Sequence, residues 1–332
     1  MYFTLAVSTT TAAGCAALTD RARIADPALL PVPGPAAVVW RSADGRAAML
    51  RWGGSGVPAT SHAGTIGVGA ATPGSGRAPI CARTSVTRVD PVYTAEVPGG
   101  VIVSDRATWA AWTAGRIGDH DPLHLCAMLN PGFPLGTVTP FTGVSALPPS
   151  TMLYVLSGIP TTTDSPGRPD ANGAGALPGD VAAALVAAVA PLREAGAASP
   201  VELSLTGGKD SRLVAAALVA AGVAVRARTY GFPGHPDVVL AAEIAGRLGI
   251  EHTVTEPATP GQQTDVAGRI RAAVLVGDGM LSAFENVGRP DPVPSAEVTA
   301  GGHGGELLRG GYAEAAVGAL GAPGAPGAPV RR

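Results

Sequence analysis

Residues 201–213, VELSLTGGKDSRL, decide how this chain folds. Residues 201–205 alternate apolar and polar side chains, as a strand does, and they end abruptly in 206–211, TGGKDS. The apolar, alanine-rich residues 212–223, RLVAAALVAAGV, then predict a helix. A strand, a glycine turn and a helix together point backbone N–H groups and a helix N-terminus at an anion. The sequence therefore predicts a phosphate-binding turn at 206–211.

The residue types in this turn suit a nucleotide phosphate with its metal ion. Gly207 and Gly208 lack a Cβ atom, so phosphate oxygens can approach the main chain closely. Ser211 can donate a hydroxyl, and Asp210 is an acid placed where Mg²⁺ would lie beside bound phosphates. The spacing of a Walker A loop is different. The alternative is a tight turn with accidental glycines, because the chain has 46 of them.

Length and composition limit the class of protein. With 332 residues the chain is long enough for two domains of about 100–200 residues each. The net charge of −2 and the 14% of charged residues do not point to nucleic acid or to an anionic membrane. The sequence contains no apolar run of about 18 residues, and its N-terminus lacks a basic leader, so we expect a cytoplasmic protein. The three cysteines are too far apart for a zinc or disulfide pattern.

The segments around the turn predict a parallel sheet. Asp180 is expected to cap a helix that leads to the strand at 201–205, and helices and strands alternate after the turn. We expect helices at 212–222, 238–248 and 264–276, and strands at 223–229 and 252–254. This order implies a parallel sheet with a ligand site at the carboxyl ends of its strands. His235 and His252 stand at a turn and at a strand start, where structural roles are the commonest.

The first half of the chain predicts a mostly β domain. Apolar runs on both sides of Asp44-Gly45 indicate a hairpin, and residues 53–80 indicate a long loop. Strands are expected at 85–89, 93–97 and 100–104, followed by a helix at 107–114. In that helix Trp109 and Trp112 are three residues apart, which favours packing over a ligand platform. Residues 158–180 lack an apolar period and predict a linker.

The turn resembles the SGGxDS pyrophosphate loop of the ATP pyrophosphatase superfamily, with Thr206 in place of the first serine. Residues 228–254, RTYGFPGHPDVVLAAEIAGRLGIEHTV, are similar to asparagine synthetase-like proteins in particular. The resemblance implies an α/β fold with a parallel-sheet, adenine nucleotide α-hydrolase-like domain at 181–316. It also implies that ATP contacts these residues of the turn and of the next strand end: Leu205, Thr206, Gly207, Gly208, Lys209, Asp210, Ser211, Tyr230, Gly231 and Phe232.

Residues 299–314, TAGGHGGELLRGGYAE, resemble the second signature of that family, a glycine turn of the form SGEGxDE followed by GGY. Aligned on GGY, Glu306 takes the place of a magnesium-binding aspartate and His303 that of a glutamate. The resemblance thus implies catalytic roles for His303 and Glu306, nucleotide contacts at Gly302 and Gly304, and magnesium held by Asp210 and Glu306. A carboxylate suits Mg²⁺, and an imidazole can act as a base near neutral pH.

Two phrases in the first half, VYTAEVPGGVIVSDRA and LNPGFPLGTVTPFTGVSALPPSTMLYV, resemble the amidotransferase domain that precedes many asparagine synthetase-type domains. In glutamine-hydrolysing members the nucleophile is the cysteine after the initiator methionine. Here that residue is Tyr2, and a phenol does not replace a thiolate as acyl acceptor. The resemblance implies a degenerate class-II amidotransferase-like domain at 1–157. An unrelated β-rich domain is the alternative.

The resemblance implies an ATP-dependent ligase that activates a carboxylate as an acyl-adenylate and transfers it to ammonia or an amine. The carboxylate is a small molecule or a peptide, and enzymes similar to β-lactam synthetase or lasso-peptide cyclase fit as well as asparagine synthetase. Ser282, Glu285 and Asn286 are candidates for the acceptor pocket. Related chains continue beyond the GGY with further helices, whereas 317–332 is a Gly-Ala-Pro tail.

That tail makes us expect a truncated chain, a homodimer or a separate C-terminal partner. A catalytically impaired ATP-binding remnant is the second hypothesis. A tRNA-modifying enzyme is disfavoured, because the chain has neither a catalytic cysteine pair nor a basic face.

Overall fold

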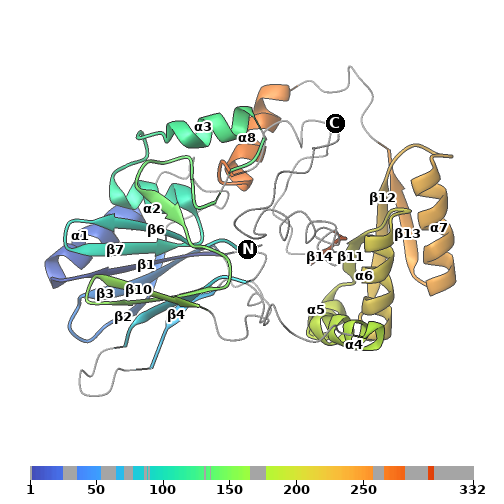
Figure 1. Ribbon diagram of the computed structural model, residues 1–332, viewed down its shortest axis with the longest axis horizontal. Coiled ribbons are helices and arrows are strands. Elements are labelled where there is room, and N and C mark those ends of the chain that lie inside the picture. Colours follow the sequence, from blue (N-terminus) through green and yellow to red (C-terminus); the bar gives the residue numbers. More distant parts are fainter. Residues whose placement is uncertain are drawn as a thin grey trace, which may run out of the picture. The chain divides into compact units, whose positions relative to one another are not determined.

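The computed structural model describes residues 2–24, 36–53, 65–70, 78–85, 88, 90–130, 132–134, 136–164, 177–256, 265–280 and 298–302. The chain divides into two compact units. The first comprises Met1–Ala174 with Ala258–Ala296, and the second comprises Gly175–Pro257 with Glu297–Arg332. Most elements of both units are labelled in Figure 1.

In its described residues the first unit contains two antiparallel sheets and four helices. The six-stranded sheet has the order β2-β3-β1-β7-β6-β8, with β1 (Tyr2–Thr9), β2 (Ala37–Arg41), β3 (Ala47–Gly53), β6 (Tyr93–Val97), β7 (Gly100–Ser104) and β8 (Val144–Ala146). The four-stranded sheet has the order β10-β9-β5-β4, with β4 (Thr65–Val68), β5 (Ile80–Arg83), β9 (Thr151–Leu156) and β10 (Ile159–Asp164). The helices are α1 (Ala12–Arg23), α2 (Ala107–Ala114), α3 (Pro122–Leu129) and α8 (Val266–Val276).

The six-stranded sheet is buried on both faces. Successive residues of a strand point to opposite faces. In β1, Leu5 and Val7 join a core with α1 and α2, whereas Ala6 joins a second core with Ile80 and Leu153 of the other sheet. The unit therefore has three layers: helices, six-stranded sheet and four-stranded sheet (Figure 1).

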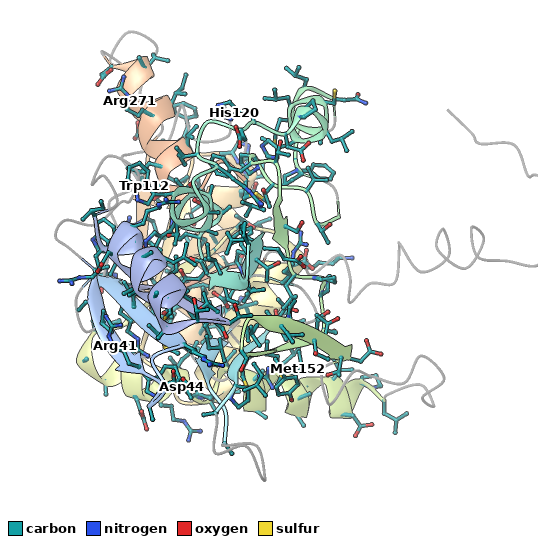
Figure 2. All side chains as sticks on the ribbon, turned by 90° about the vertical axis from the view of Figure 1, so that its left-hand side faces the viewer. Arg41, Asp44, Trp112, His120, Met152 and Arg271 are labelled. Atoms are coloured by element: carbon teal, nitrogen blue, oxygen red, sulfur yellow. The ribbon has the colours of Figure 1, made fainter. Side chains whose placement is uncertain are left out.

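The two tryptophans of α2 hold this helix against α1, as the packing interpretation predicted. The indole N–H of Trp109 donates to the carbonyl of Ala22 at 3.1 Å, and that of Trp112 donates to the carbonyl of Arg21 at 3.0 Å. Trp109 also packs edge-on against Trp52, with the ring centroids 5.8 Å apart. Figure 2 shows Trp112 on α2 among the side chains of this unit.

Several of the local predictions for this unit are confirmed. The hairpin around Asp44-Gly45 is β2 paired with β3, and Gly45 has the left-handed φ of +68° that favours glycine. β6, β7 and α2 have the predicted bounds. The prediction of one long loop at 53–80 is wrong where β4 forms, and the central strand β1 and helix α1 were not predicted.

The predicted linker at 158–180 is wrong at both ends. Residues 159–164 form β10, which pairs antiparallel with β9 through a tight turn at Ser157 and Gly158, both with positive φ. All six residues of β10 are exposed, so the strand has no apolar alternation to reveal it. At the other end, helix α4 begins at Pro178, and Asp180 lies in its first turn instead of at the cap. The Asp180 carboxylate accepts the Leu177 N–H at 3.1 Å.

By its contacts α8 groups with the first unit, although the sequence places it in the predicted domain at 181–316. Just after α8, Asp278 accepts the backbone N–H groups of Ala107 and Thr108 at the start of α2. Its carboxylate lies 3.2 Å from the guanidinium of Arg106, which also donates to the Leu275 carbonyl. Both charged side chains are almost completely buried. The helix predicted at 264–276 is therefore attached to α2 instead of to the parallel sheet.

Asp105 makes the stability of the first unit dependent on pH. One of its carboxylate oxygens accepts the Thr4 N–H at 2.8 Å, and the other is buried without a partner among the described residues. Burial raises the pKa of Asp105 to about 8; the Thr4 N–H and Arg106 oppose this rise, and Asp278 adds to it. The folded chain thus keeps a proton that the unfolded chain releases near pH 4. The free energy of unfolding should fall as the pH rises from about 4 to 8.

We expect Asp105→Asn to flatten this fall, because the amide has no proton to release. Urea unfolding of the wild type and the variant at pH 5 and pH 8 measures the effect. Burial also raises the pKa of Asp278, but this residue is the same in both chains, so its contribution cancels in the comparison. Equal losses of stability between the two pH values in the wild type and the variant would contradict the assignment.

The second unit is built on a parallel sheet, as predicted. Its strand order is β13-β12-β11-β14, with β11 (Val201–Ser204), β12 (Val225–Tyr230), β13 (Glu251–Thr255) and β14 (Thr299–Ala300). The helices are α4 (Pro178–Val189), α5 (Leu192–Ala198), α6 (Lys209–Ala220) and α7 (Pro236–Leu248). Among the described residues no single helix is long and apolar enough to cross a membrane, although α4 and α5, bent by 47°, meet that test as a pair.

The two faces of the parallel sheet differ in character. Leu203 and Ala227 are buried in one core with Leu218 of α6 and Ala241 of α7. Side chains on the other face are polar: Glu202 lies 2.7 Å from the guanidinium of Arg228 and 3.4 Å from that of Arg226. α6 and α7 therefore pack on the apolar face of the sheet. The carboxyl end of β11 leads directly into the glycine turn.

Candidate functional site

The glycine turn connects the end of β11 at Ser204 to the start of α6 at Lys209. Side chains of the turn itself hold its shape. The Thr206 N–H donates to the Ser211 hydroxyl oxygen at 3.2 Å, and the Gly208 N–H donates to the Thr206 hydroxyl oxygen at 3.1 Å. Ser211 is only 5% exposed. Its hydroxyl, which the sequence assigned to pyrophosphate, closes the turn in this structure.

The two glycines of the turn have different surroundings. The Gly207 N–H donates to the Asp237 carboxylate of α7 at 3.0 Å. A Cβ atom at Gly207 would lie 2.8 Å from that carboxylate and 2.9 Å from the Leu240 side chain, whereas one at Gly208 would meet only the Thr206 hydroxyl, at 3.1 Å. Gly207 therefore allows α7 to pack closely, and Gly208 is the glycine that faces solvent. Sequence reasoning missed Asp237, which directly precedes the helix predicted at 238–248 and lies in the first turn of the observed α7.

The second glycine segment lies against the first at Gly302. β14 pairs in parallel with β11, so the residues that follow both strands emerge at the same edge of the sheet. A Cβ atom at Gly302 would lie 2.5 Å from the Ser211 nitrogen and 2.9 Å from the Asp210 carbonyl carbon. Other predicted site residues of this part lie outside the described residues: Ser282, Glu285, Asn286, His303, Gly304 and Glu306.

The predicted adenosine-contacting residues follow β12 at the same edge of the sheet. Tyr230 is 44% exposed and Phe232 is 53% exposed, so both rings are accessible within the unit. Gly231 donates its N–H to the Thr255 carbonyl at 3.1 Å and thereby joins the ends of β12 and β13. Leu205, in contrast, is fully buried in the core, so its side chain is not placed to contact a ligand.

Both histidines of this region have structural roles, as the sequence favoured. The Thr229 hydroxyl donates to the Leu205 carbonyl at 2.7 Å and lies 2.8 Å from Nε2 of His252. Burial lowers the pKa of His252, which favours the neutral ring. His235 caps α7, with its Nδ1 accepting the Asp237 N–H at 3.2 Å.

The described residues give the site an anion-binding character with one acid. The first turn of α6 begins at the exposed Lys209 and contains Asp210. Backbone N–H groups and the helix dipole at such a terminus favour a phosphate. Asp210 can supply one carboxylate to Mg²⁺, and within the described ranges no three acidic, histidine or cysteine side chains come together as a metal site.

Comparison with known proteins relates one part of the chain to a known family. Residues 180–284 match the family model of asparagine synthase. No curated protein matches the chain. The matched segment contains the glycine turn, β12, α7, β13 and α8. Residues 180–284 are therefore similar to the asparagine synthase family.

Proposed function

We propose that this chain is an ATP-dependent, amide-forming ligase of the asparagine synthetase type. One observation carries the proposal: Gly302 packs against Asp210 and Ser211. Two segments that resemble the ATP-binding signatures of this family thus meet at the carboxyl edge of a parallel sheet, the usual ligand site of such folds. The first of them lies within the residues that match the asparagine synthase family.

In the proposed reaction a carboxylate oxygen of the substrate attacks the α-phosphorus of ATP. The bond from that phosphorus to the bridging oxygen breaks, and pyrophosphate leaves with the electron pair. The nitrogen of an amine then attacks the acyl carbon of the adenylate, AMP leaves, and the amine gives up a proton. Positioning and shielding of the phosphate charges supply most of the rate.

Named residues would have distinct roles in this scheme. The solvent-facing side of the turn at Gly208 and the first turn of α6 would hold pyrophosphate. Asp210 and Glu306 would bind Mg²⁺, which neutralises phosphate charge. His303 would take the proton of the amine. Tyr230 and Phe232 would border the adenosine with their accessible rings.

The proposed amine donor is free ammonia or a substrate amine, since the chain has Tyr2 where a glutaminase needs cysteine. Tyr2 begins the central strand β1 and pairs with Gly53 of β3. The proposed carboxylate is a small molecule or a peptide. This substrate pair is that of a β-lactam synthetase-like or lasso-peptide-cyclase-like enzyme as much as of asparagine synthetase.

Exchange of labelled pyrophosphate into ATP by the full chain with Mg²⁺ tests the function. We expect exchange with one carboxylate among aspartate, other amino acids and peptides. Asp210→Ala should lower it by about 100-fold or more, because a group that stabilises phosphate charge is lost. Glu243→Ala is the matched control, since this exposed carboxylate on α7 pairs only with the solvent-exposed Arg247 among the contacts described. Unchanged exchange in Asp210→Ala would refute the assignment.

Binding of ATP without exchange would indicate the second candidate, a nucleotide-binding protein that has lost catalysis. The departures from the second signature at His303 and Glu306 favour this candidate. Recovery of exchange on adding a separately encoded C-terminal segment would instead point to a divided enzyme.

A further inference from the structure

We propose that Asp237 is a positioning residue that holds the glycine turn in the conformation required by the phosphates of ATP. This inference rests on the proposed function and assigns a role to a residue outside both signatures. The evidence is the contact between the first turn of α7 and Gly207, two places 30 residues apart in the sequence.

The contact combines a hydrogen bond with close packing. The Asp237 carboxylate accepts the Gly207 N–H at 3.0 Å, which fixes the peptide plane that leads into the turn. The Leu240 side chain would lie 2.9 Å from a Cβ atom at Gly207, so it packs against the same residue. No other acceptor for this N–H is present among the described contacts of the turn. The first peptide of the turn is therefore held from the side of α7.

α7 presents the carboxylate from a rigid position. Pro236 is the first residue of the helix, and the His235 ring accepts the Asp237 N–H. Val238 is 7% exposed, and one of its methyl carbons would lie 2.7 Å from a Cβ atom at Gly231. The start of α7 thus packs against both strand ends, next to β11 and β12. The position of Asp237 is set by these contacts, although half of its side-chain surface is exposed.

The Asp237 carboxylate could either compete with phosphate for the Gly207 N–H or hold the turn in place, and the packing around Gly207 distinguishes these two roles. If it competed with phosphate for the Gly207 N–H, a phosphate oxygen would need room between Gly207 and α7. The close approach of Leu240 fills that side of the glycine. Gly207 therefore serves the fit to α7, and phosphate binding falls to Gly208 and the first turn of α6. Asp237 acts on the ligand only through the turn.

The test compares Asp237→Ala with Asp237→Asn. Asparagine keeps an oxygen that can accept the Gly207 N–H, whereas alanine removes the acceptor. Binding of MgATP and of inorganic pyrophosphate to the full chain is measured by calorimetry. We expect about tenfold weaker binding in the alanine variant, because the Gly207 N–H loses its acceptor, and affinity within about threefold of wild type in the asparagine variant.

Asp180→Ala is the matched control for these variants. Its carboxylate also lies in the first turn of a helix of the same unit and accepts a backbone N–H, that of Leu177. The control removes an equivalent bond without touching the glycine turn, so its affinity for MgATP should equal that of the wild type. A loss as large as that of Asp237→Ala would overturn the positioning role.

Amide hydrogen exchange of the peptide around Gly207, without nucleotide, gives a second readout that does not depend on the ligase reaction. Exchange should be faster in Asp237→Ala and near wild type in Asp237→Asn. Equal exchange in all chains, unchanged or tighter ATP binding in the alanine variant, or an equal loss in the asparagine variant would each refute the inference. If the wild type binds MgATP but does not exchange pyrophosphate, only the proposed ligase function is refuted. The MgATP affinities of Asp237→Ala and Asp237→Asn would still decide whether Asp237 positions the turn.

Discussion

Asp278→Ala should lower the free energy of unfolding of the chain by about 3–5 kcal/mol, the usual cost of removing one partner of a buried ion pair. Asp278 is 6% exposed and Arg106 is 3% exposed, so the alanine variant leaves a guanidinium buried beside an uncharged methyl group. The change also removes the acceptor of two N–H groups at the start of α2. The φ of +57° at residue 278 adds strain for alanine in the same direction.

Urea unfolding measures this loss, with two further variants as controls. Asp121→Ala removes the N-cap carboxylate of α3, which accepts the Leu123 N–H. Because this carboxylate pairs with no buried cation in the described contacts, its loss should lower the free energy of unfolding by only about 1 kcal/mol. Arg106→Met in the Asp278→Ala chain should recover part of the loss, because methionine can pack on the Phe3 ring that the guanidinium covers at 4.8 Å. A loss in Asp278→Ala no greater than in Asp121→Ala would contradict the prediction.

This ion pair also shows where sequence reasoning stopped. Local signals predicted the hairpin at Asp44-Gly45, the bounds of α2 and the alternation of strands and helices after the glycine turn, because each depends on neighbouring residues. The partner of α2 at Asp278 is 171 residues from Ala107. A cap supplied from that distance leaves no local pattern, so the contact between α2 and the end of α8 could not be predicted.

A second physical reason explains why the sequence did not predict β1 and β10. The residues of β1 are buried on both faces of the sheet, so its two threonines and its serine are buried with its leucine and its valine. The alternating pattern of a half-exposed strand is therefore absent. β10 is exposed throughout and relies on its pairing with β9, which residues 159–164 do not reveal on their own.

The candidate site was predicted in outline but not in its internal contacts. The turn at 206–211 and the approach of Gly302 follow from motifs whose geometry is fixed by a strand, a glycine and a helix. The use of the Ser211 hydroxyl within the turn and the bond from Gly207 to Asp237 depend on tertiary packing. Those contacts decide which side of the turn faces a ligand.

Gly302→Ala should weaken MgATP binding by about tenfold to a hundredfold and abolish the proposed pyrophosphate exchange. A Cβ atom at this position would lie 2.5 Å from the Ser211 nitrogen and 2.9 Å from the Asp210 carbonyl carbon, both of them backbone atoms that cannot rotate away. Relief requires the two glycine segments to separate. Overpacking of this kind costs about 1–3 kcal/mol, and each 1.4 kcal/mol is about tenfold in affinity.

Gly246→Ala provides the matched control for this variant, because it makes the same substitution in the same unit where space is open. A Cβ atom at Gly246 of α7 meets nothing within 4 Å, so alanine should stabilise the helix by up to about 1 kcal/mol and leave MgATP affinity unchanged. Calorimetric titration of both variants separates a local effect at the site from a general effect on folding. If Gly302→Ala bound MgATP as tightly as Gly246→Ala, the second glycine segment would have no part in holding the nucleotide. The site would then reduce to the turn between β11 and α6.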